Sequence, residues 1–332
     1  MDTPDLPRDL QQLLATLQER GVVEAYAKVS ALPGGVSNDV LLVQDRSNRY
    51  VVKRPLERLR VERDWYADTE RVEREAAALA VMQELTPGRV PRVVDFDPEH
   101  RILTLALAPA GWFEWRTALL DGDAAEGWIG AALGQILAEW HSRTTGPSAV
   151  PASLRDQRFF EELRITPFYG AVAEQHPKLR SSLEDLVEDL RCSRCLVHGD
   201  FSPKNVLIGP GELWVLDAEV AHIGAPVFDL AFMHTHLLLK SVNQPRIAAE
   251  LADCADAFLT AYREGAPDLA QISEQSLVQH IGALLLSRVD GLSPCNYLAE
   301  RTHPQVRELA YAALLEGRNP WEAVAARGRF GS

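Results

Sequence analysis

The sequence has few cysteines, no excess of positive charge and no long apolar run, and each deficit argues against a class of protein. Its four cysteines, Cys192, Cys195, Cys254 and Cys295, form no regular framework. Cys192 and Cys195 are spaced as a pair, but zinc would require two further ligands beside them. We therefore expect free thiols.

Lysine and arginine total 34 against 47 aspartate and glutamate residues, which gives a net charge of −13. Nucleic-acid partners favour a basic surface, so this balance predicts none. It is compatible with a cationic substrate, although solubility alone explains it more simply. No apolar stretch is long enough to cross a bilayer, and no basic segment leads into an apolar run near residue 1. We expect no membrane partner, no signal peptide and a cytoplasmic location.

Apolar residues make up 46% of the 332 residues, which is enough for substantial hydrophobic cores. A chain of this length exceeds the usual size of one compact domain, so two lobes are expected. The chain contains no internal repeat and no low-complexity segment.

The most informative stretch, residues 196–219, predicts a β-hairpin. Short apolar runs at 206–208 and 213–216 flank a Gly-Pro-Gly turn at 209–211. Because a hairpin brings its two ends together, polar residues before its first strand and after its second should converge.

Those polar residues are His198, Asp200 and Asn205 at one end, and Asp217 and Glu219 at the other. Two carboxylates and an amide oxygen are hard ligands, which Mg²⁺ accepts alongside substrate phosphates. The spacing His-x-Asp-x-x-x-x-Asn, with a second Asp on the next strand, is the catalytic and metal-binding signature of protein-kinase-like phosphotransferases.

Two departures from protein kinases refine this resemblance: Gly199 replaces an Arg, and Leu-Asp-Ala-Glu at 216–219 replaces Asp-Phe-Gly. With them the chain resembles the aminoglycoside phosphotransferase and choline kinase family of small-molecule phosphotransferases, from about residue 30 to 300. The resemblance implies an α+β, bilobal protein-kinase-like fold. We expect a small antiparallel-sheet N-lobe with one main helix, residues 1–110, which binds nucleotide. A larger, mostly helical C-lobe, residues 111–332, would hold the catalytic hairpin and the acceptor site.

A glycine-containing turn precedes the first candidate for phosphate binding. Gly34, Gly35 and Ser37 lie in a turn between two predicted strands, where backbone N–H groups can approach phosphate oxygens. The following strand, 50–53, ends in Lys53. A buried strand does not place a lysine at its apolar end without a reason.

The helix predicted at residues 69–85 is rich in Ala, Glu and Leu. Glu75 lies beside its apolar face and can reach Lys53, while Glu73 is the competing partner. The resemblance implies that Lys53, braced by this glutamate, pairs with the phosphates of the nucleotide.

Two further strands, at 92–96 and 101–107, lead to a segment that the resemblance implies is a hinge. The adenine ring would hydrogen-bond to backbone near Leu107 and Ala108. The family often has an acidic residue close to this point, whereas here the stretch is apolar. Backbone recognition does not need that side chain.

Helical patterns dominate beyond residue 112. His141, at the end of a core helix, is predicted to be structural. The segment Gly-x-Pro-x-x-Asp-Leu-Ala at 224–231 resembles the family's segment after the metal-binding Asp, and the resemblance implies that Asp229 braces the catalytic loop. The expected helices span 124–141, one or two segments of 157–191 divided at 166–170, 230–240, 245–263, 272–288, and one or two segments of 303–327.

The resemblance implies transfer of the γ-phosphoryl group of ATP or GTP to a hydroxyl. Asp200 would be the catalytic residue that orients the hydroxyl and takes its proton, while Asn205 and Asp217 hold Mg²⁺. Lys204 either adds charge near the transferred phosphate or points to solvent. Glu219 is a weaker candidate for a second Mg²⁺ or for the acceptor.

The acceptor is a small molecule whose identity the sequence leaves open. An aminoglycoside would need an acidic pocket, a sugar would need neutral and basic hydrogen-bonding groups, and choline would need aromatic rings. Arg288 and Asp290, expected in the segment 287–294 between two helices, are candidates either for acceptor binding or for a salt-bridged loop anchor. The alternative function is a catalytically silent nucleotide-binding module, which the intact set of motif residues argues against. Nothing indicates the oligomeric state.

Overall fold

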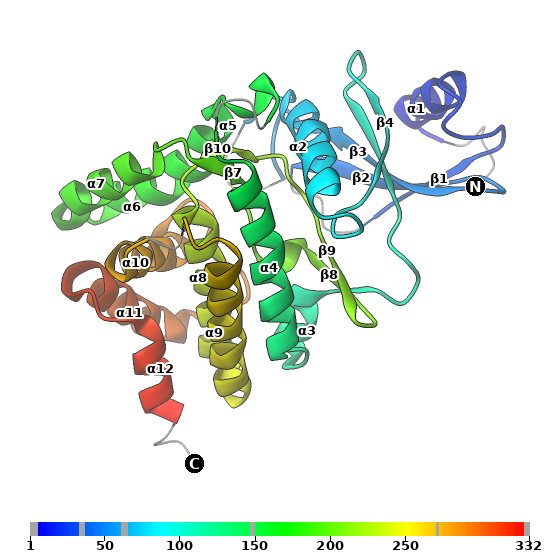
Figure 1. The fold of residues 1–332 in the computed structure, drawn as a ribbon. Helices are drawn as coiled ribbons and strands as arrows, with labels where there is room; N and C mark the ends of the chain where they lie inside the picture. The colour runs from blue at the N-terminus through cyan, green and yellow to red at the C-terminus, as the bar shows by residue number, and fades with distance from the viewer. Residues whose placement is uncertain (1–5, 33–36, 61–65, 147–149, 270–271, 329–332) are drawn as a thin grey trace.

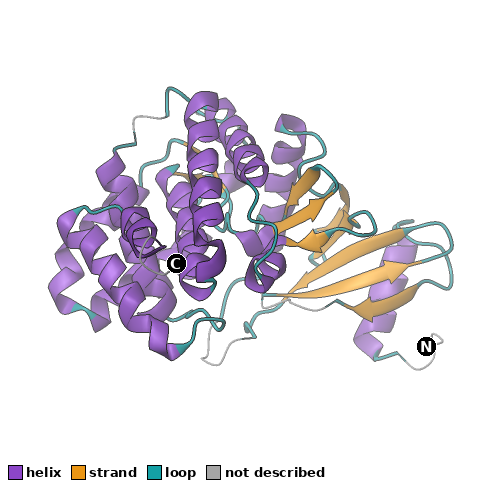
Figure 2. Cartoon of the chain, turned by 90° about the horizontal axis from the view of Figure 1, so that it is seen from below, coloured by secondary structure: helices purple, strands orange, loops and turns teal. Residues whose placement is uncertain are grey.

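The structure, a computed structural model, describes residues 6–32, 37–60, 66–146, 150–269 and 272–328. An antiparallel sheet with two helices forms the N-terminal part, and helices form most of the remainder (Figure 1). Seen from below, the strands of the N-terminal part extend away from the helical mass (Figure 2). None of the described helices is both long enough and apolar enough to span a membrane.

The N-terminal sheet has five strands in the order β1-β2-β3-β5-β4, and every neighbouring pair is antiparallel. Strand β4 carries a register shift between Val93 and Asp95. The sheet and its helices consist of α1 (Arg8–Glu19), β1 (Lys28–Ala31), β2 (Asn38–Gln44), β3 (Arg49–Pro55), α2 (Arg71–Leu85), β4 (Val93–Asp97) and β5 (Ile102–Ala106).

Two apolar clusters cover opposite faces of this sheet. Leu13, Leu14 and Leu17 of α1 pack with Val52 of β3 on one face. On the other face Leu79 of α2 joins a cluster that continues into the helical part. Because side chains alternate along a strand, the residue after Val52 must point toward α2. The sheet therefore aims Lys53 at the helix predicted to carry its partner.

The helical part begins after a short strand, Phe113–Glu114, that pairs with the first strand of the predicted hairpin. Helix α4 packs along α9, and α8 packs against α10. The longer elements are α3 (Trp115–Asp121), α4 (Gly127–Arg143), α7 (Arg180–Leu190), α8 (Val227–Asn243), α9 (Ala248–Gly265), α10 (Glu274–Asp290), α11 (His303–Glu316) and α12 (Pro320–Gly328). The short strands are β6 (Phe113–Glu114), β7 (Cys195–Val197), β8 (Val206–Gly209), β9 (Glu212–Val215) and β10 (His222–Gly224). Short helices are η2 (Ala152–Leu154), α5 (Arg158–Phe160), α6 (Ala171–Gln175), η4 (Pro177–Leu179), η5 (Pro203–Asn205), η6 (Pro245–Ile247) and η7 (Glu300–Thr302).

One helical expectation was wrong. Residues 166–170 were predicted to divide two helices, but they lie inside a π-helix, η3 (Glu161–Gly170), that runs directly into α6. Pro167 within it has no N–H to donate to a preceding turn, which disfavours a regular α-helix there. The wider π-helical turn accommodates the proline, and such turns often occur at functional sites.

Candidate active site

The β-hairpin predicted at residues 206–216 is present. Strands β8 and β9 pair with Val206 opposite Val215, and the Leu216 N–H donates to the Asn205 carbonyl at 2.8 Å. That bond closes the open end of the hairpin and places Asp217 beside Asn205. Asp217 has a φ of 67°, a left-handed conformation that costs a non-glycine residue conformational energy and is common at functional sites.

The loop before the hairpin is braced by Asp229, as predicted. Its carboxylate accepts hydrogen bonds from the backbone N–H groups of His198 and Gly199, at 2.6 and 2.9 Å. Gly199 has a φ of 76°, and a Cβ there would lie 2.9 Å from the Val220 carbonyl oxygen. This explains why a glycine occupies the position. His141, buried against Asp229 with its Nε2 3.4 Å from Oδ2, has the structural place that was predicted.

His198 is a strut rather than a base. Its Nδ1 accepts the Asp200 N–H at 3.1 Å, and its Nε2 lies 3.0 Å from the Leu216 carbonyl oxygen. Both ring nitrogens are therefore engaged by backbone. Burial lowers the pKa of His198, although nearby carboxylates oppose that shift. A neutral ring with both nitrogens occupied positions the loop but does not take a proton from a substrate.

The carboxylate of Asp200 receives three side-chain donors at one oxygen. Asn205 Nδ2, Lys204 Nζ and Arg164 Nη2 lie 2.9, 2.8 and 3.2 Å from Oδ2. The described residues make no hydrogen bond to Oδ1, which is left for another group. Burial raises the pKa of Asp200, but the charges of Lys204 and Arg164 outweigh burial and hold the pKa below its usual value. Asp200 is thus an oriented, ionised carboxylate.

The buried ammonium of Lys53 links the sheet, helix α2 and the hairpin. Its Nζ lies 2.6 Å from Glu75 Oε1 and 2.7 Å from Asp217 Oδ1. The predicted pairing with Glu75 is confirmed, and Glu73 is exposed on the other side of the helix. Glu75 and Asp217, which are far apart in the sequence, thus contact the same ammonium group.

The pKa shifts in this cluster follow from burial and from the sharing of one cation. Burial lowers the pKa of Lys53, but Asp217 and Glu75 raise it well above its usual value. Burial raises the pKa of Asp217, and Lys53 more than reverses this shift. Burial also raises the pKa of Glu75, and Lys53 opposes this shift only in part, because the charges of Asp217 and Glu219 raise the pKa as well. A second cation near Asp217 would find a carboxylate that remains ionised.

The turn before β2 was predicted to cover the phosphates. Gly34 and Gly35 lie outside the described residues. The Ser37 carbonyl at its end accepts a hydrogen bond from Arg71 Nη2 at 2.5 Å. Arg71 is fully buried, and its Nε lies 3.2 Å from Glu219 Oε2, which also accepts from Asn38 Nδ2 at 3.0 Å. Glu219 therefore ties the hairpin to the turn and to α2, and the metal-binding and acceptor-binding roles considered for it stay predictions.

The segment predicted as a hinge follows β5 directly. Leu107 and Ala108 are half-buried and lie outside regular secondary structure, between the sheet and strand β6. The structure shows no contact that assigns them to a nucleotide.

Arg288 and Asp290, the two weaker candidates for acceptor binding, have different surroundings at the end of α10. Both lie in the last helical turn and not in a loop, which corrects the expectation. Asp290 is held by Arg307 Nη2 at 2.6 Å and by His176 Nε2 at 2.9 Å, so it has the anchoring role that was considered. Arg288 lies over the Phe168 ring, 5.5 Å from its centroid, on the same ring as Arg164.

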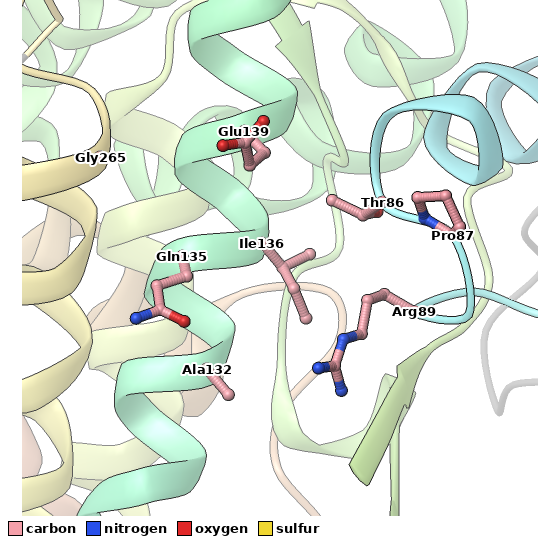
Figure 3. Close-up of a pocket in the computed structure, with 8 residues that line it drawn as sticks. All are labelled: Thr86, Pro87, Arg89, Ala132, Gln135, Ile136, Glu139 and Gly265. Carbon is pink, nitrogen blue, oxygen red and sulfur yellow. The ribbon is translucent and has the colours of Figure 1, made fainter.

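A cavity of about 360 Å³ lies elsewhere, between the turn after α2 and helix α4 (Figure 3). Its lining includes Thr86, Arg89, Gln135 and Glu139, and none of the predicted site residues. Glu139 is exposed and pairs with Arg143 on its own helix. The residues predicted to carry the chemistry lie at the Asp200 cluster, so this cavity is not the candidate active site.

The donor set at the hairpin fits Mg²⁺. Asn205 directs its Nδ2 to Asp200, which leaves its amide oxygen as the atom available to a cation. Asp217 adds an ionised carboxylate whose Oδ1 faces Lys53. No group of three or more His, Cys, Asp or Glu side chains suited to a metal exists in the described part of the chain. Mg²⁺ commonly uses only one or two protein carboxylates and takes its other ligands from water and substrate phosphates.

Two arginines of this site were not predicted. Arg164, from the π-helix, contacts Asp200 and donates through Nε to the Gly199 carbonyl at 2.7 Å. Arg71, at the start of α2, joins the turn to Glu219. Neither belongs to a motif, and each meets its partners across a long stretch of sequence, so no local signal could have identified it.

Comparison with known proteins supports a phosphotransferase. The profile described as the phosphotransferase enzyme family matches residues 28–274. No curated protein sequence matches the chain.

Solved structures match over almost the whole chain. Choline kinase LicA from Streptococcus pneumoniae is 18% identical with a TM-score of 0.54, and the match covers 92% of this chain and 99% of that one. Amicoumacin kinase hAmiN is 13% identical with a TM-score of 0.57, covering 95% and 97%. Choline kinase from Cryptosporidium parvum Iowa II is 11% identical with a TM-score of 0.55, covering 96% and 97%. At these identities the likeness shows the fold, and the predicted protein-kinase-like fold is confirmed.

Proposed function

The chain belongs to the phosphotransferase enzyme family and is a phosphotransferase with an alcohol group as acceptor; on this premise we propose that it transfers the γ-phosphoryl group of ATP or GTP. The acceptor is a hydroxyl of a small molecule of aminoglycoside, sugar or amino-alcohol type. The observation that carries this proposal is the buried Lys53 ammonium, 2.6 Å from Glu75 and 2.7 Å from Asp217. A sheet lysine braced by a helix glutamate is the phosphate-binding device of kinase-like enzymes.

The two parts of the chain would have different roles in this reaction. Residues 1–110 would bind the nucleotide, and residues 111–332 would supply the catalytic hairpin and the acceptor site. Lys53 would hold the nucleotide phosphates, with the backbone at Gly34, Gly35 and Ser37 over them and the backbone near Leu107 and Ala108 against the base. Amicoumacin kinase, which shares the fold, was solved in complex with AMP-PNP and Ca²⁺, in support of a nucleotide and a divalent cation here.

The proposed transfer requires positioning and charge neutralisation more than covalent catalysis. The acceptor oxygen forms a bond to the γ-phosphorus, and the bond from that phosphorus to the bridging oxygen of the diphosphate breaks. The electron pair leaves with ADP or GDP. Asp200, through its unoccupied Oδ1, orients the hydroxyl and accepts its proton, which then passes to solvent.

Asn205 and Asp217 are the residues that would hold Mg²⁺. When bound, the ion neutralises charge on the β- and γ-phosphates. The ionised state of Asp217, which Lys53 maintains despite burial, prepares the site for that charge. Arg164 and Lys204 keep Asp200 ionised and fix its orientation.

Turnover of Mg·ATP by the purified protein tests this function, with aminoglycosides, choline, homoserine and simple sugars offered as acceptors. We expect phosphorylation of at least one acceptor, and its loss in Asp200→Asn. Nucleotide binding without turnover of any acceptor, with Asp200→Asn behaving like wild type, would indicate a silent module. Failure to bind either Mg·ATP or Mg·GTP would contradict the proposal.

A further inference from the structure

Cationic side chains gather around Asp200 on the helical side of the candidate active site. Helix α8 packs against α10 and α3, η3 packs against α10, and η5 of the loop before the hairpin packs against α8 and α3. Arg164 and Arg288 share the Phe168 ring, each 5.5 Å from its centroid. Lys240 of α8 lies 5.1 Å from the centroid of Tyr297. The cationic cluster comprises Arg116, Arg164, Lys204, Lys240 and Arg288.

These cations influence one another across the cluster. Burial lowers the pKa of His236 on α8, and the charges of Lys240, Arg288, Lys204 and Arg164 lower it further. Burial also lowers the pKa of Lys240 to about 7, with the charges of Arg116 and Arg288 adding to the shift and Cys295 and Glu114 opposing it. Residues from five separate elements therefore contribute positive potential to one region.

Two members of the cluster have no carboxylate partner. Arg164 and Lys204 share Asp200, and Arg116 lies 3.1 Å from Glu114. In the described part of the chain, no carboxylate lies within ion-pair distance of Lys240 or Arg288.

Weaker partners surround these two cations. Lys240 Nζ is 3.5 Å from the His236 carbonyl oxygen, and Arg288 Nε is 3.4 Å from Cys295 Sγ. Lys240 is 1% exposed, so its ammonium group is removed from bulk solvent.

Burial of an unpaired cation is unfavourable, and proteins normally avoid it. The chain carries a net charge of −13, so acidic residues are abundant. Among the described residues, however, Glu114 acts on Lys240 and Asp200 acts on Arg288 only from beyond ion-pair distance. Loss of a proton from Lys240 would remove one of the two unpaired charges. The Arg288 guanidinium, in contrast, keeps its charge at any physiological pH.

The Tyr297 hydroxyl is also buried in this region, and among the described residues its neighbour is the Cys295 thiol, which is a weak hydrogen-bond partner. A buried donor with only a weak partner, beside cations that have no carboxylate, is suited to an anionic ligand.

Cationic acceptors fit this region poorly. An aminoglycoside would need carboxylates, and those present already pair with protein cations. Choline would need the open face of an aromatic ring. Phe168 faces Arg164 and Arg288, and Tyr297 faces Lys240, so the protein's own cations already face these rings.

We propose that the acceptor is an acidic hydroxy compound whose phosphate or carboxylate group binds Lys240, Arg288 and the Tyr297 hydroxyl while its own hydroxyl reaches Asp200. This rests on the proposed function and narrows its acceptor to the sugar type that carries an acid group. The transferred phosphoryl group forms a monoester on the hydroxyl, ADP or GDP leaves with the electron pair, and the hydroxyl proton passes to Asp200. The acid group is unchanged.

The first test measures binding of inorganic phosphate, the smallest probe of the acid-binding position. Calorimetry is performed on protein saturated with Mg·AMP-PNP, so that phosphate cannot use the nucleotide site. We expect wild type to bind phosphate, and Lys240→Met and Arg288→Met to bind it about tenfold or more weakly. Arg288→Lys, which keeps a charge, should retain part of the affinity. Lys178→Met, at an exposed position on η4, is the matched control and should bind as wild type does.

Nucleotide affinity and circular dichroism establish that each variant is folded. Equal phosphate affinity in wild type and both Met variants, or no phosphate binding by wild type, overturns the proposal.

The second test compares acceptors that share a skeleton and differ in charge: glucose, glucosamine, gluconate and glucose 6-phosphate, and the matching ribose series. We expect kcat/KM for an acidic member to exceed that of its neutral and cationic relatives by about tenfold or more. The two acidic members distinguish a carboxylate from a phosphate preference. Preference for a cationic or neutral member overturns this inference and leaves the proposed function intact. Absence of any nucleotide binding instead removes the proposed function.

Discussion

Two groups of buried charges, one on the sheet side and one on the helical side of the candidate active site, are organised differently. On the sheet side, Lys53 has carboxylates at 2.6 and 2.7 Å, and Arg71 has one at 3.2 Å. On the helical side, Lys240 and Arg288 have none among the described residues. The first group holds itself together through its own ion pairs. The second lacks a counter-charge, which a ligand can supply.

We therefore expect the charges on the sheet side to stabilise the fold and those on the helical side to bind a ligand. Breaking a buried ion pair leaves an uncompensated charge and destabilises the fold. Removing a buried cation that has no partner relieves an unfavourable interaction instead. Lysine variants on the two sides should therefore change stability in opposite directions.

The largest expected effect is on catalysis, where the two sides meet. Asp200→Asn keeps the shape of the side chain but removes the proton acceptor and the anion that Lys204 and Arg164 surround. We expect kcat to fall by about 10²–10⁴-fold while Mg·ATP affinity changes little. Steady-state kinetics and calorimetry on the same preparation measure both quantities. Wild-type kcat in this variant would remove Asp200 from the chemistry.

The second largest effect is expected when the ion pairs on the sheet side are broken. Lys53→Met leaves Glu75 and Asp217 buried without their cation, so we expect the free energy of unfolding to fall by about 3 kcal/mol. Urea unfolding followed by circular dichroism measures the change. Lys28→Met, at an exposed position on β1, is the matched control and should stay within about 0.5 kcal/mol of wild type. Similar small changes in both variants would mean that the Lys53 pairs do not stabilise the fold.

The smallest effect has the opposite sign and depends on pH. Lys240→Met should raise the free energy of unfolding by roughly 1–3 kcal/mol near pH 6, because it removes a buried unpaired charge. Burial lowers the pKa of Lys240 to about 7 in the folded protein, against about 10.4 for an unfolded lysine. Between these values the unfolded chain binds a proton that the folded protein does not. The contribution of Lys240 to the free energy of unfolding of the wild-type protein therefore becomes more favourable as pH rises.

The gain from Lys240→Met should consequently be largest below about pH 7 and shrink as pH rises toward about 10. Urea unfolding of both proteins at several pH values checks this trend, since other titrating groups cancel in the difference. Destabilisation by Lys240→Met at every pH would show that Lys240 is paired, and the contrast between the two sides would fail.

Local spacing made one half of the site predictable. The hairpin follows from two apolar runs and a turn, so the proximity of Asn205 and Asp217 was within reach of the sequence. The pairing of Lys53 with Glu75 was accessible for a similar reason, because strand alternation and helix periodicity each set the face of one side chain. Strand alternation and helix periodicity also predict the order of the main elements and the face that each one buries.

The other half depends on contacts between distant elements. Arg164 reaches Asp200 from a π-helix that forms around Pro167, a residue that local pattern interprets as a break. Lys240 lies in an apolar helix, and its lack of a carboxylate is visible only once α8, α10 and α3 are packed together. Asp290 was ambiguous until Arg307 and His176 were seen to hold it.

Calorimetric titration of Mg·ATP and Mg·GTP into wild type and Lys53→Met tests most directly that the Lys53 cluster is a nucleotide-binding catalytic centre. We predict saturable binding of at least one nucleotide by wild type, and affinity reduced about tenfold or more in Lys53→Met under conditions where the variant remains folded. No binding of either nucleotide by wild type, or equal affinity in the two proteins, would contradict the account.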